Sequence, residues 1–231
     1  MKSLCVITAR GGSKRIPRKN IKDFLGKPII AYSILSALDS GLFDEVMVST
    51  DDKEIAEIVL EYGAKVPFMR SEKNSDDHAT TYDVIKEVIN KYKDQKRNFD
   101  YLCCFYPTSP LIDSKTLKDG FNLLIEGEYK TAFSVGEYSS PIQRALRSSN
   151  GRLEMFHPEF QNSRSQDLEP AYFDAGQFYW FDLAKIKNEQ HVYTDNSGLL
   201  VLDNDKVQDI DSISDWKLAE LKYQMLQDEE R

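Results

Sequence analysis

The N-terminal stretch constrains the fold most, because an apolar run of strand length at residues 4–9 is followed almost directly by the glycine pair Gly11-Gly12. Five cations accompany this pair within ten residues: Arg10, Lys14, Arg15, Arg18 and Lys19. A strand that ends in a glycine-rich turn places backbone N–H groups and basic side chains at the carboxyl edge of a sheet, where open α/β proteins bind ligands. The chain contains neither G-x-x-x-x-G-K-S/T nor G-x-G-x-x-G. The glycine pair and its cations therefore predict a phosphate-binding loop of another kind. The alternative is a solvated basic turn, but such a turn needs only one glycine and fewer cations.

Strand and helix signals alternate over the first two thirds of the chain. Pro28 marks the start of a first helix and Gly41 its end. The further expected helices cover 53–62 (capped by Asp51 and Asp52), 82–92 and 115–125 (capped by Ser114), and the expected strands cover 4–9, 45–50, an edge strand at 65–68, 101–106 and 131–135. Such alternation with near-continuous apolar strands predicts an α/β fold with a doubly wound, mostly parallel, Rossmann-like sheet.

The pattern changes between about residues 137 and 171. Single aromatic residues and turn pairs such as Asn150-Gly151 replace the helical period there, which predicts an inserted hairpin. Strand character returns at 177–181 and 199–202. A final helix is expected from an apolar stripe of Trp216, Leu218, Ala219, Leu221, Met225 and Leu226. We therefore expect one domain over residues 1–231 with a small inserted unit at about 137–171.

Composition limits the possible partners. Thirty basic residues against thirty-eight acidic ones give a net charge of −8, which disfavours binding to nucleic acid and to anionic membranes. No apolar stretch is long enough to span a bilayer, and the N-terminus shows no signal-peptide pattern. The three cysteines lie in apolar runs without C-x-x-C spacing, as reduced thiols do. We expect a cytoplasmic protein.

Near the C-terminus, Asp209 and Asp211 are separated by a single residue. On an extended segment, carboxylates at i and i+2 point to the same side and can hold one hard cation. Mg²⁺ prefers one or two carboxylates together with phosphate oxygens of a substrate. The alternative is that Asp211 caps the following helix and Asp209 is solvated. A cationic phosphate loop elsewhere in the chain favours the metal site.

Two polar segments flank predicted elements. Residues 106–110 follow a strand and offer the hydroxyls of Thr108 and Ser109, although an ordinary strand-to-helix turn also explains them. Residues 76–81 precede a helix, so either Thr80 or Thr81 is expected as its N-cap, with the other polar groups free to face a bound base.

A third polar region covers 164–167 and 174–180. Arg164 suits a carboxylate bidentately, and Gln166, Asp174 and Gln177 suit hydroxyls and amides. That is the polar lining which a sugar acid needs. A structural ion pair between Arg164 and Asp167 is the alternative.

Taken together, these residues resemble a known family. The segments 9–20, 107–110 and 209–211 resemble, in order and spacing, the motifs of the cytidylyltransferases that activate nonulosonic acids, such as the CMP-sialic acid synthetases. The similarity covers nearly the whole chain. Two departures from the sialic pattern, Tyr106 in place of Gln and 174–180 in place of an Asn-Gly sequence, resemble the branch that uses pseudaminic acid.

The resemblance implies a reaction in which CTP and a nonulosonic acid give a CMP-sugar and pyrophosphate. It implies that Arg10, Lys14 and Lys19 are catalytic and that Asp209 and Asp211 hold Mg²⁺. The implied CTP site is formed by Arg10, Gly11, Gly12, Ser13, Lys14, Asn20, Arg70, Thr80 and Thr81, and the implied sugar site by Tyr106, Thr108, Ser109, Arg164, Gln166, Asp174, Gln177 and Tyr179.

Three alternatives stay open at this point. The sugar is pseudaminic acid by resemblance, with a sialic or legionaminic acid as the alternative. A metal-dependent glycosyltransferase also combines a nucleotide-binding sheet with an Asp-x-Asp pair, but it gives the N-terminal basic loop no role. The third alternative is a nucleotide-binding scaffold without activity. The insertion at about 137–171 resembles the dimerisation element of the family, which implies a homodimer.

Overall fold

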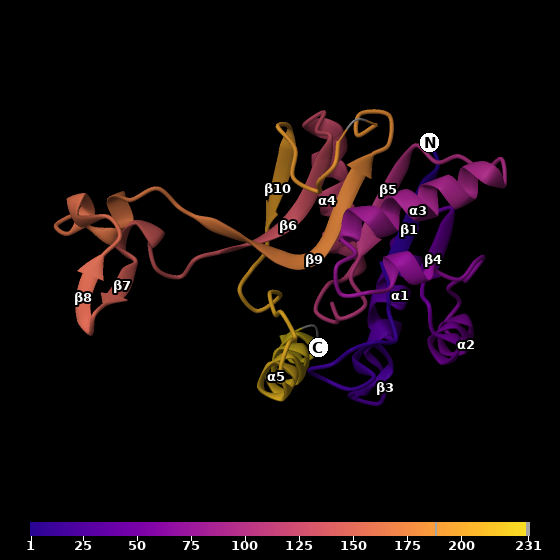
Figure 1. The fold of residues 1–231 in the computed structure, drawn as a ribbon, viewed down its shortest axis with the longest axis horizontal. Helices are drawn as coiled ribbons and strands as arrows, with labels where there is room; N and C mark the ends of the chain where they lie inside the picture. Colours follow the sequence, from indigo (N-terminus) through magenta and orange to yellow (C-terminus); the bar gives the residue numbers. More distant parts are fainter. Residues whose placement is uncertain (188, 230–231) are drawn as a thin grey trace.

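The computed structural model describes residues 1–187 and 189–229. Its centre is a six-stranded sheet in the order β10-β6-β9-β5-β1-β4 (Figure 1). The strands are β1 (Ser3–Thr8), β4 (Glu45–Ser49), β5 (Tyr101–Phe105), β6 (Thr131–Glu137), β9 (Tyr172–Asp182) and β10 (Ser197–Val201). β1 pairs in parallel with β4 and β5, and β6 pairs in parallel with β10. Only β9 runs antiparallel to its neighbours β5 and β6. The predicted mostly parallel sheet is confirmed. The antiparallel direction of β9 was not predicted from the sequence.

Helices cover both faces of this sheet. Because side chains alternate along a strand, Cys5 and Ile7 pack on one face while Leu4 and Val6 pack on the other. The first face is covered by α1 (Ile29–Ser40), α2 (Lys53–Glu61) and α4 (Ser114–Glu126), and the second by α3 (Thr81–Asp94). The predicted doubly wound arrangement is confirmed.

A smaller apolar cluster lies near the C-terminus. The antiparallel strands β2 (Asp23–Phe24) and β3 (Lys27–Pro28) lie beside the last helix, α5 (Ile213–Glu229). The rings of Phe24 and Trp216 meet edge to face at 5.5 Å between centroids. Within the predicted apolar stripe of α5, Trp216 and Ala219 are buried, whereas Leu218, Leu221 and Met225 are exposed in the single chain. The contact with α5 holds residues 209–211 next to the N-terminal basic turn.

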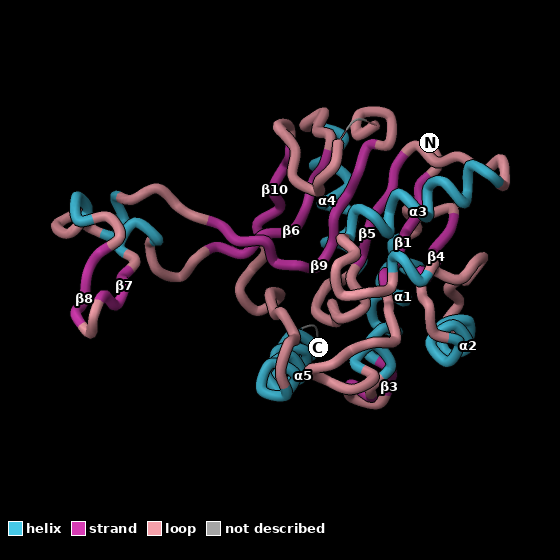
Figure 2. Tube along the Cα trace, in the orientation of Figure 1, coloured by secondary structure: helices cyan, strands magenta, loops and turns pink. Residues whose placement is uncertain are grey.

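The segment between β6 and β9 leaves the sheet and forms an arm (Figures 1 and 2). At its tip β7 (Leu146–Ser149) and β8 (Arg152–Met155) form an antiparallel hairpin. Asn150 and Gly151 connect them with φ of 51° and 76°. These are the positive angles that a two-residue hairpin turn requires, so the pair acts as the sequence predicts.

Three local predictions are wrong. Residues 65–68 form no strand, because only Lys65 bridges to Met47 and Pro67 lacks an N–H for further pairing. Asp113, not Ser114, caps α4, since its carboxylate accepts the backbone N–H of Thr116 at 2.6 Å. The strand at 177–181 begins earlier, at Tyr172. The described residues also form the short 3₁₀ helices η1 (Lys19–Ile21), η2 (Glu72–Asn74), η3 (Ile142–Arg144), η4 (Pro158–Phe160) and η5 (Ser165–Asp167). None of the helices in the described part of the chain could cross a membrane.

Candidate active site

A cavity of about 560 Å³ opens at the carboxyl ends of the parallel strands. The loops that follow β1 and β5, the segment 70–79 before α3 and the start of α3 form its walls. Among the residues that line it are Arg10, Ser13, Lys14, Arg15, Lys19, Asn20, Arg70, Asp76, Asp77, Thr81, Tyr106 and Thr108. This is the edge at which open α/β sheets bind their ligands. Most of the residues predicted for CTP therefore meet in one place.

The basic turn after β1 is held by contacts of its own. The N–H of Gly11 donates to Asp51 at 3.0 Å, and a Cβ at Gly11 would lie 2.5 Å from the Asp52 carboxylate, so only glycine fits there. The buried amide of Asn20 donates to the carbonyl of Arg10 at 3.0 Å. Neither Gly11 nor Gly12 lines the cavity. The basic side chains, and not the backbone amides of the two glycines, therefore face the cavity.

Arg18 differs from the other cations of the turn. It pairs with Asp52 through two hydrogen bonds of 2.5 and 3.1 Å and with Glu54 at 2.5 Å. The Arg18 guanidinium lowers the pKa of Asp52 to about 2. Since Asp52 also caps α2 by accepting the N–H of Ile55, Arg18 fastens the turn to that helix. Its role is structural.

Lys19 reaches across to the C-terminal aspartates. Its ammonium donates to the carbonyl of Ile210 at 2.7 Å and lies 3.7 Å from a carboxylate oxygen of Asp211. Burial lowers the pKa of Lys19, while the charges of Asp211 and Asp209 act in the opposite direction. A partly desolvated ammonium beside two carboxylates is well placed to act on a phosphate that binds between them.

Asp209 and Asp211 are the predicted metal ligands. Partial burial and the neighbouring charge of Asp211 raise the pKa of Asp209. Asp211 accepts a hydrogen bond from Arg15 at 2.5 Å, and it does not cap α5, because Ser212 and Asp215 bond the backbone there. A divalent cation would relieve the repulsion between the two carboxylates. The described residues contain no group of three or more His, Cys, Asp or Glu side chains that could hold a metal ion. The pair therefore fits a Mg²⁺ that takes its other ligands from phosphate and water.

The nucleotide side of the cavity contains Arg70 and Thr81. Arg70 is buried and donates from Nε to the hydroxyl of Ser49 at 3.0 Å; burial lowers its pKa. The hydroxyl of Thr81 bonds that of Tyr106 at 2.7 Å. Thr80 instead caps α3 by a reciprocal exchange with Asp83, and it does not line the cavity. Of the two threonines, Thr81 thus faces the site and Thr80 is the cap.

A hydroxyl network adjoins Tyr106. The rings of Tyr106 and Tyr179 lie 5.5 Å apart, and Asp174 accepts hydrogen bonds from both Tyr179 and Tyr193 at 2.6 Å. Burial raises the pKa of Tyr106 to about 12, so its hydroxyl stays protonated. Tyr193 was not predicted, because nothing in its local sequence distinguishes it.

Two predicted sugar ligands serve the framework instead. Ser109 is fully buried and donates to the carbonyl of Gln177 at 3.3 Å. Gln177 is buried as well, and its amide donates to the carbonyls of Ala175 at 2.6 Å and Gln208 at 3.4 Å. These bonds join the turn after β5, strand β9 and the segment before Asp209. Their side chains position the site and do not face it.

Gln166 lies in η5 and Arg164 directly precedes it, so both are on the arm, outside the cavity of their own chain. Arg164 forms two hydrogen bonds with Asp167, at 2.7 and 3.0 Å. The ion pair that the sequence offered as an alternative is therefore present. Within one chain these two residues do not contribute to the sugar site.

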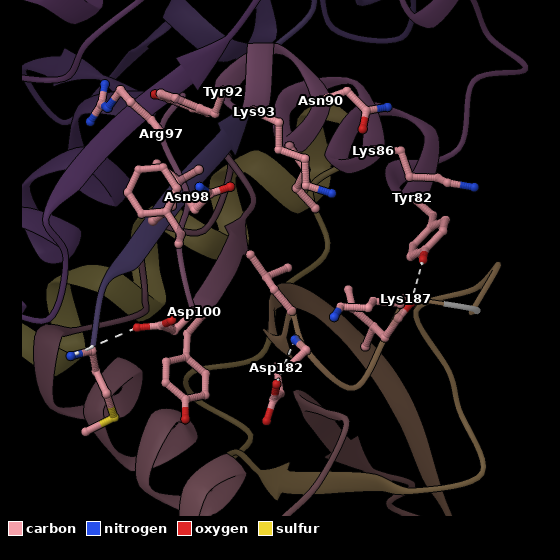
Figure 3. A pocket seen from close by; sticks show the side chains of 18 residues that line it. Tyr82, Lys86, Asn90, Tyr92, Lys93, Arg97, Asn98, Asp100, Asp182 and Lys187 are labelled. Atoms are coloured by element: carbon pink, nitrogen blue, oxygen red, sulfur yellow. Dashed lines mark hydrogen bonds and ion pairs between the residues drawn. The ribbon is translucent and has the colours of Figure 1, made fainter. Parts of the chain in front are cut away.

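A second cavity, of about 940 Å³, lies at the opposite, amino edge of the sheet. Figure 3 shows Lys86, Asn90 and Lys93 in a row along α3 on one wall. Its two carboxylates, Asp100 and Asp182, accept backbone N–H groups at 2.7 and 3.0 Å. It holds none of the residues that the sequence motifs select. We therefore assign the active site to the smaller cavity.

Comparison with known proteins identifies the family. A family model described as cytidylyltransferase matches residues 4–220. The chain belongs to the cytidylyltransferase family. It is 46% identical over 226 residues to the pseudaminic acid cytidylyltransferase of Campylobacter jejuni, covering 97% of each chain. It is 33% identical to the CMP-N,N'-diacetyllegionaminic acid synthase of Legionella pneumophila, covering 99% of each.

The fold agrees with solved structures. The structure of CMP:2-keto-3-deoxy-manno-octonic acid synthetase complexed with CTP superposes with a TM-score of 0.69 at 19% identity, covering 99% of this chain and 100% of that one. The family assignment makes the chain a nucleotidyltransferase. It decides against the glycosyltransferase and the inactive scaffold.

Proposed function

We propose that the chain transfers CMP from CTP to the anomeric hydroxyl of pseudaminic acid and releases pyrophosphate. One observation supports this most strongly: Lys19, which lines the cavity, lies 3.7 Å from a carboxylate oxygen of Asp211, so the cations proposed to bind phosphate adjoin the carboxylates proposed to hold the metal. The relatives that support the sugar assignment are named pseudaminic acid cytidylyltransferases at 46% and 45% identity.

The proposed step is an in-line displacement. The C2 hydroxyl oxygen of the sugar forms a bond to the α-phosphorus of CTP while the bond to the β-phosphate oxygen breaks. Pyrophosphate leaves and the hydroxyl proton passes to solvent. Such a transfer depends on positioning and on neutralising phosphate charge. Arg10, Ser13 and Lys14 bind the triphosphate, and Lys19 stabilises charge on the α-phosphate and the leaving group.

Asp209 and Asp211 would hold Mg²⁺. Bound there, the cation would supply positive charge that offsets the phosphate charge and acidifies the attacking hydroxyl. Arg15 pairs with Asp211 in the free chain. Because Arg15 also lines the cavity, it is placed to contact a phosphate group there.

We assign the sugar to the side of the cavity next to Tyr106. Tyr179 packs beside Tyr106 and donates to Asp174, and we propose these polar groups as candidates to meet the hydroxyl and amide groups of the sugar, although neither lines the cavity in the single chain. Arg164 and Gln166 reach a sugar only from a second chain, so the proposal includes a homodimer in which the arm covers the partner's site. Exposed apolar side chains on the arm, Leu146, Leu153 and Phe156, support such a contact. Static light scattering tests it, since a mass near 26.6 kDa would show a monomer.

The free, buried thiols Cys5, Cys103 and Cys104 suit a reducing compartment, and we propose a cytoplasmic location. Fractionation of the native host, with the protein followed by antibody, checks it.

The deciding experiment measures pyrophosphate release from CTP and Mg²⁺ with pseudaminic, N,N'-diacetyllegionaminic and N-acetylneuraminic acids in parallel. Release with pseudaminic acid alone is expected. Release with only another acid keeps the reaction and overturns the sugar assignment. No release with any of them overturns the proposed function.

A further inference from the structure

The carboxylate of Asp77 contacts Arg10 and Lys14, two of the side chains proposed to bind the triphosphate of CTP. One of its oxygens accepts from Arg10 at 2.7 Å, and the other accepts from the ammonium of Lys14. Each oxygen is thus bonded to a different cation of the basic turn. The contact joins residues that are 67 and 63 positions apart in the sequence.

The loop that carries Asp77 has a defined shape. Asp76 accepts the N–H groups of His78 at 2.9 Å and Ala79 at 2.8 Å, which tightens the chain just before α3. The carbonyl of Asp76 accepts a further bond from Arg10 at 3.0 Å. Because the aspartate side chain is short, this turn aims the Asp77 carboxylate at the basic turn. Hydrogen bonds from Lys14 and Arg10 lower the pKa of Asp77, so it stays charged.

We propose that Asp77 occupies the place of the triphosphate in the free protein and thereby sets the affinity for CTP. The proposal rests on the proposed function. A phosphate oxygen and a carboxylate oxygen need the same N–H donors, and they repel each other when both are charged. CTP can therefore bind Arg10 and Lys14 only when these side chains release their hydrogen bonds to Asp77.

This exchange has two consequences. CTP binds more weakly than it would to unpaired Arg10 and Lys14, because their contacts with the triphosphate replace their contacts with Asp77. In return, Asp77 holds two long, mobile side chains near the geometry that the phosphates require. A ligand with little negative charge cannot displace Asp77 well, so the contact favours polyphosphates over weaker anions.

Both ion pairs are exposed, and exposed pairs contribute little individually. Losing both should tighten CTP binding by about three- to tenfold. Asp77→Asn is the test variant. Asp76→Asn is its matched control, because it removes the same charge from the same loop while its amide oxygen can still accept the N–H groups of His78 and Ala79.

The experiment is isothermal titration of the full chain with CTP and Mg²⁺, without a sugar acid, and in parallel with inorganic tripolyphosphate. We expect Asp77→Asn to bind both ligands about three- to tenfold more tightly and Asp76→Asn to change them by less than about twofold. Asp77→Ala removes the same contacts and should behave as Asp77→Asn does. Unchanged or weaker binding by both Asp77 variants overturns the proposal, as does equal tightening by the Asp76 control.

The same titrations separate this proposal from the proposed function. If Asp77→Asn tightens tripolyphosphate binding but no sugar acid supports pyrophosphate release, the role of Asp77 stands and the proposed function falls. If the wild-type protein turns over while Asp77→Asn binds no more tightly, the role of Asp77 falls alone. Absence of any CTP or tripolyphosphate binding by the wild type overturns both.

Discussion

The two cavities lie at opposite edges of one sheet, and they use charge differently. Beside the amino-edge cavity, the side chain of Glu45 is 1% exposed and is bonded by Arg97, Lys65 and Tyr92, although Glu45 itself does not line that cavity. At the carboxyl edge the ion pairs are open to solvent, with Asp77 46% and Asp211 36% exposed. Buried pairs are costly to break, whereas exposed pairs can exchange partners at little cost. The smaller cavity is therefore the one suited to binding charged ligands.

The comparison also shows that size does not locate the site. The amino-edge cavity holds about 940 Å³ against 560 Å³ at the carboxyl edge. Loops that follow parallel strands meet at the carboxyl edge, where separate motifs come together.

The largest effect is expected from Asp211→Asn, which should abolish Mg²⁺-dependent pyrophosphate release because one of the two metal carboxylates is lost. The measurement is the rate as a function of Mg²⁺ concentration. Asp203→Asn, an exposed acid on the preceding loop, is the control and should titrate as the wild type does. An unchanged Mg²⁺ titration for Asp211→Asn would rule out its role as a ligand.

Lys19→Ala should lower turnover by roughly 10²-fold or more, the scale expected for one electrostatic contact with the transition state. Steady-state rates with saturating CTP and sugar acid check it. Lys27→Ala, in the β2–β3 hairpin outside the cavity, serves as the control. Near-normal turnover in a folded Lys19→Ala protein would contradict the assignment.

Glu45→Gln tests the amino edge through stability. Burial opposes the Glu45 charge, but hydrogen bonds from Arg97, Tyr92 and Lys65 outweigh it and lower its pKa. A lowered pKa stabilises the fold above the ordinary glutamate value of about 4.3, and this contribution is lost as pH falls through the folded-state pKa. The variant should lose about 2 to 4 kcal/mol at pH 7, and the difference should shrink in acid.

Urea unfolding at pH 7 and at acidic pH measures both parts of the Glu45 prediction. Glu57→Gln on the exposed side of α2 is the control. A Glu45→Gln deficit that stays constant with pH would show that the carboxylate charge is not the cause.

The smallest effect is expected from the double substitution Lys86→Gln and Lys93→Gln. Both residues line the amino-edge cavity and contact nothing in the active site, so turnover should stay within about twofold of wild type. Steady-state rates measured beside those of Lys19→Ala decide it. A tenfold loss would mean that the amino-edge cavity takes part in the reaction.

The sequence alone determined the features that depend on neighbours along the chain. The strand at Leu4, the basic turn after it and the hairpin turn at Asn150-Gly151 follow from hydrophobic runs and turn chemistry. The close spacing of Asp209 and Asp211 predicts a metal pair from local sequence in the same way. Each of these signals is complete within a few residues.

The tertiary structure decided which of these pieces meet. Arg15 pairs with Asp211 across 196 positions, and Asp77 reaches Arg10 across 67. Tyr193 joins Asp174 only because β9 is inserted antiparallel between β5 and β6. Arg164 lies on the arm that leaves the sheet between β6 and β9, so it stays outside the cavity of its own chain. The order and direction of the strands determine where these side chains lie. The pattern of apolar and polar residues along the chain predicts individual strands but not their order in the sheet.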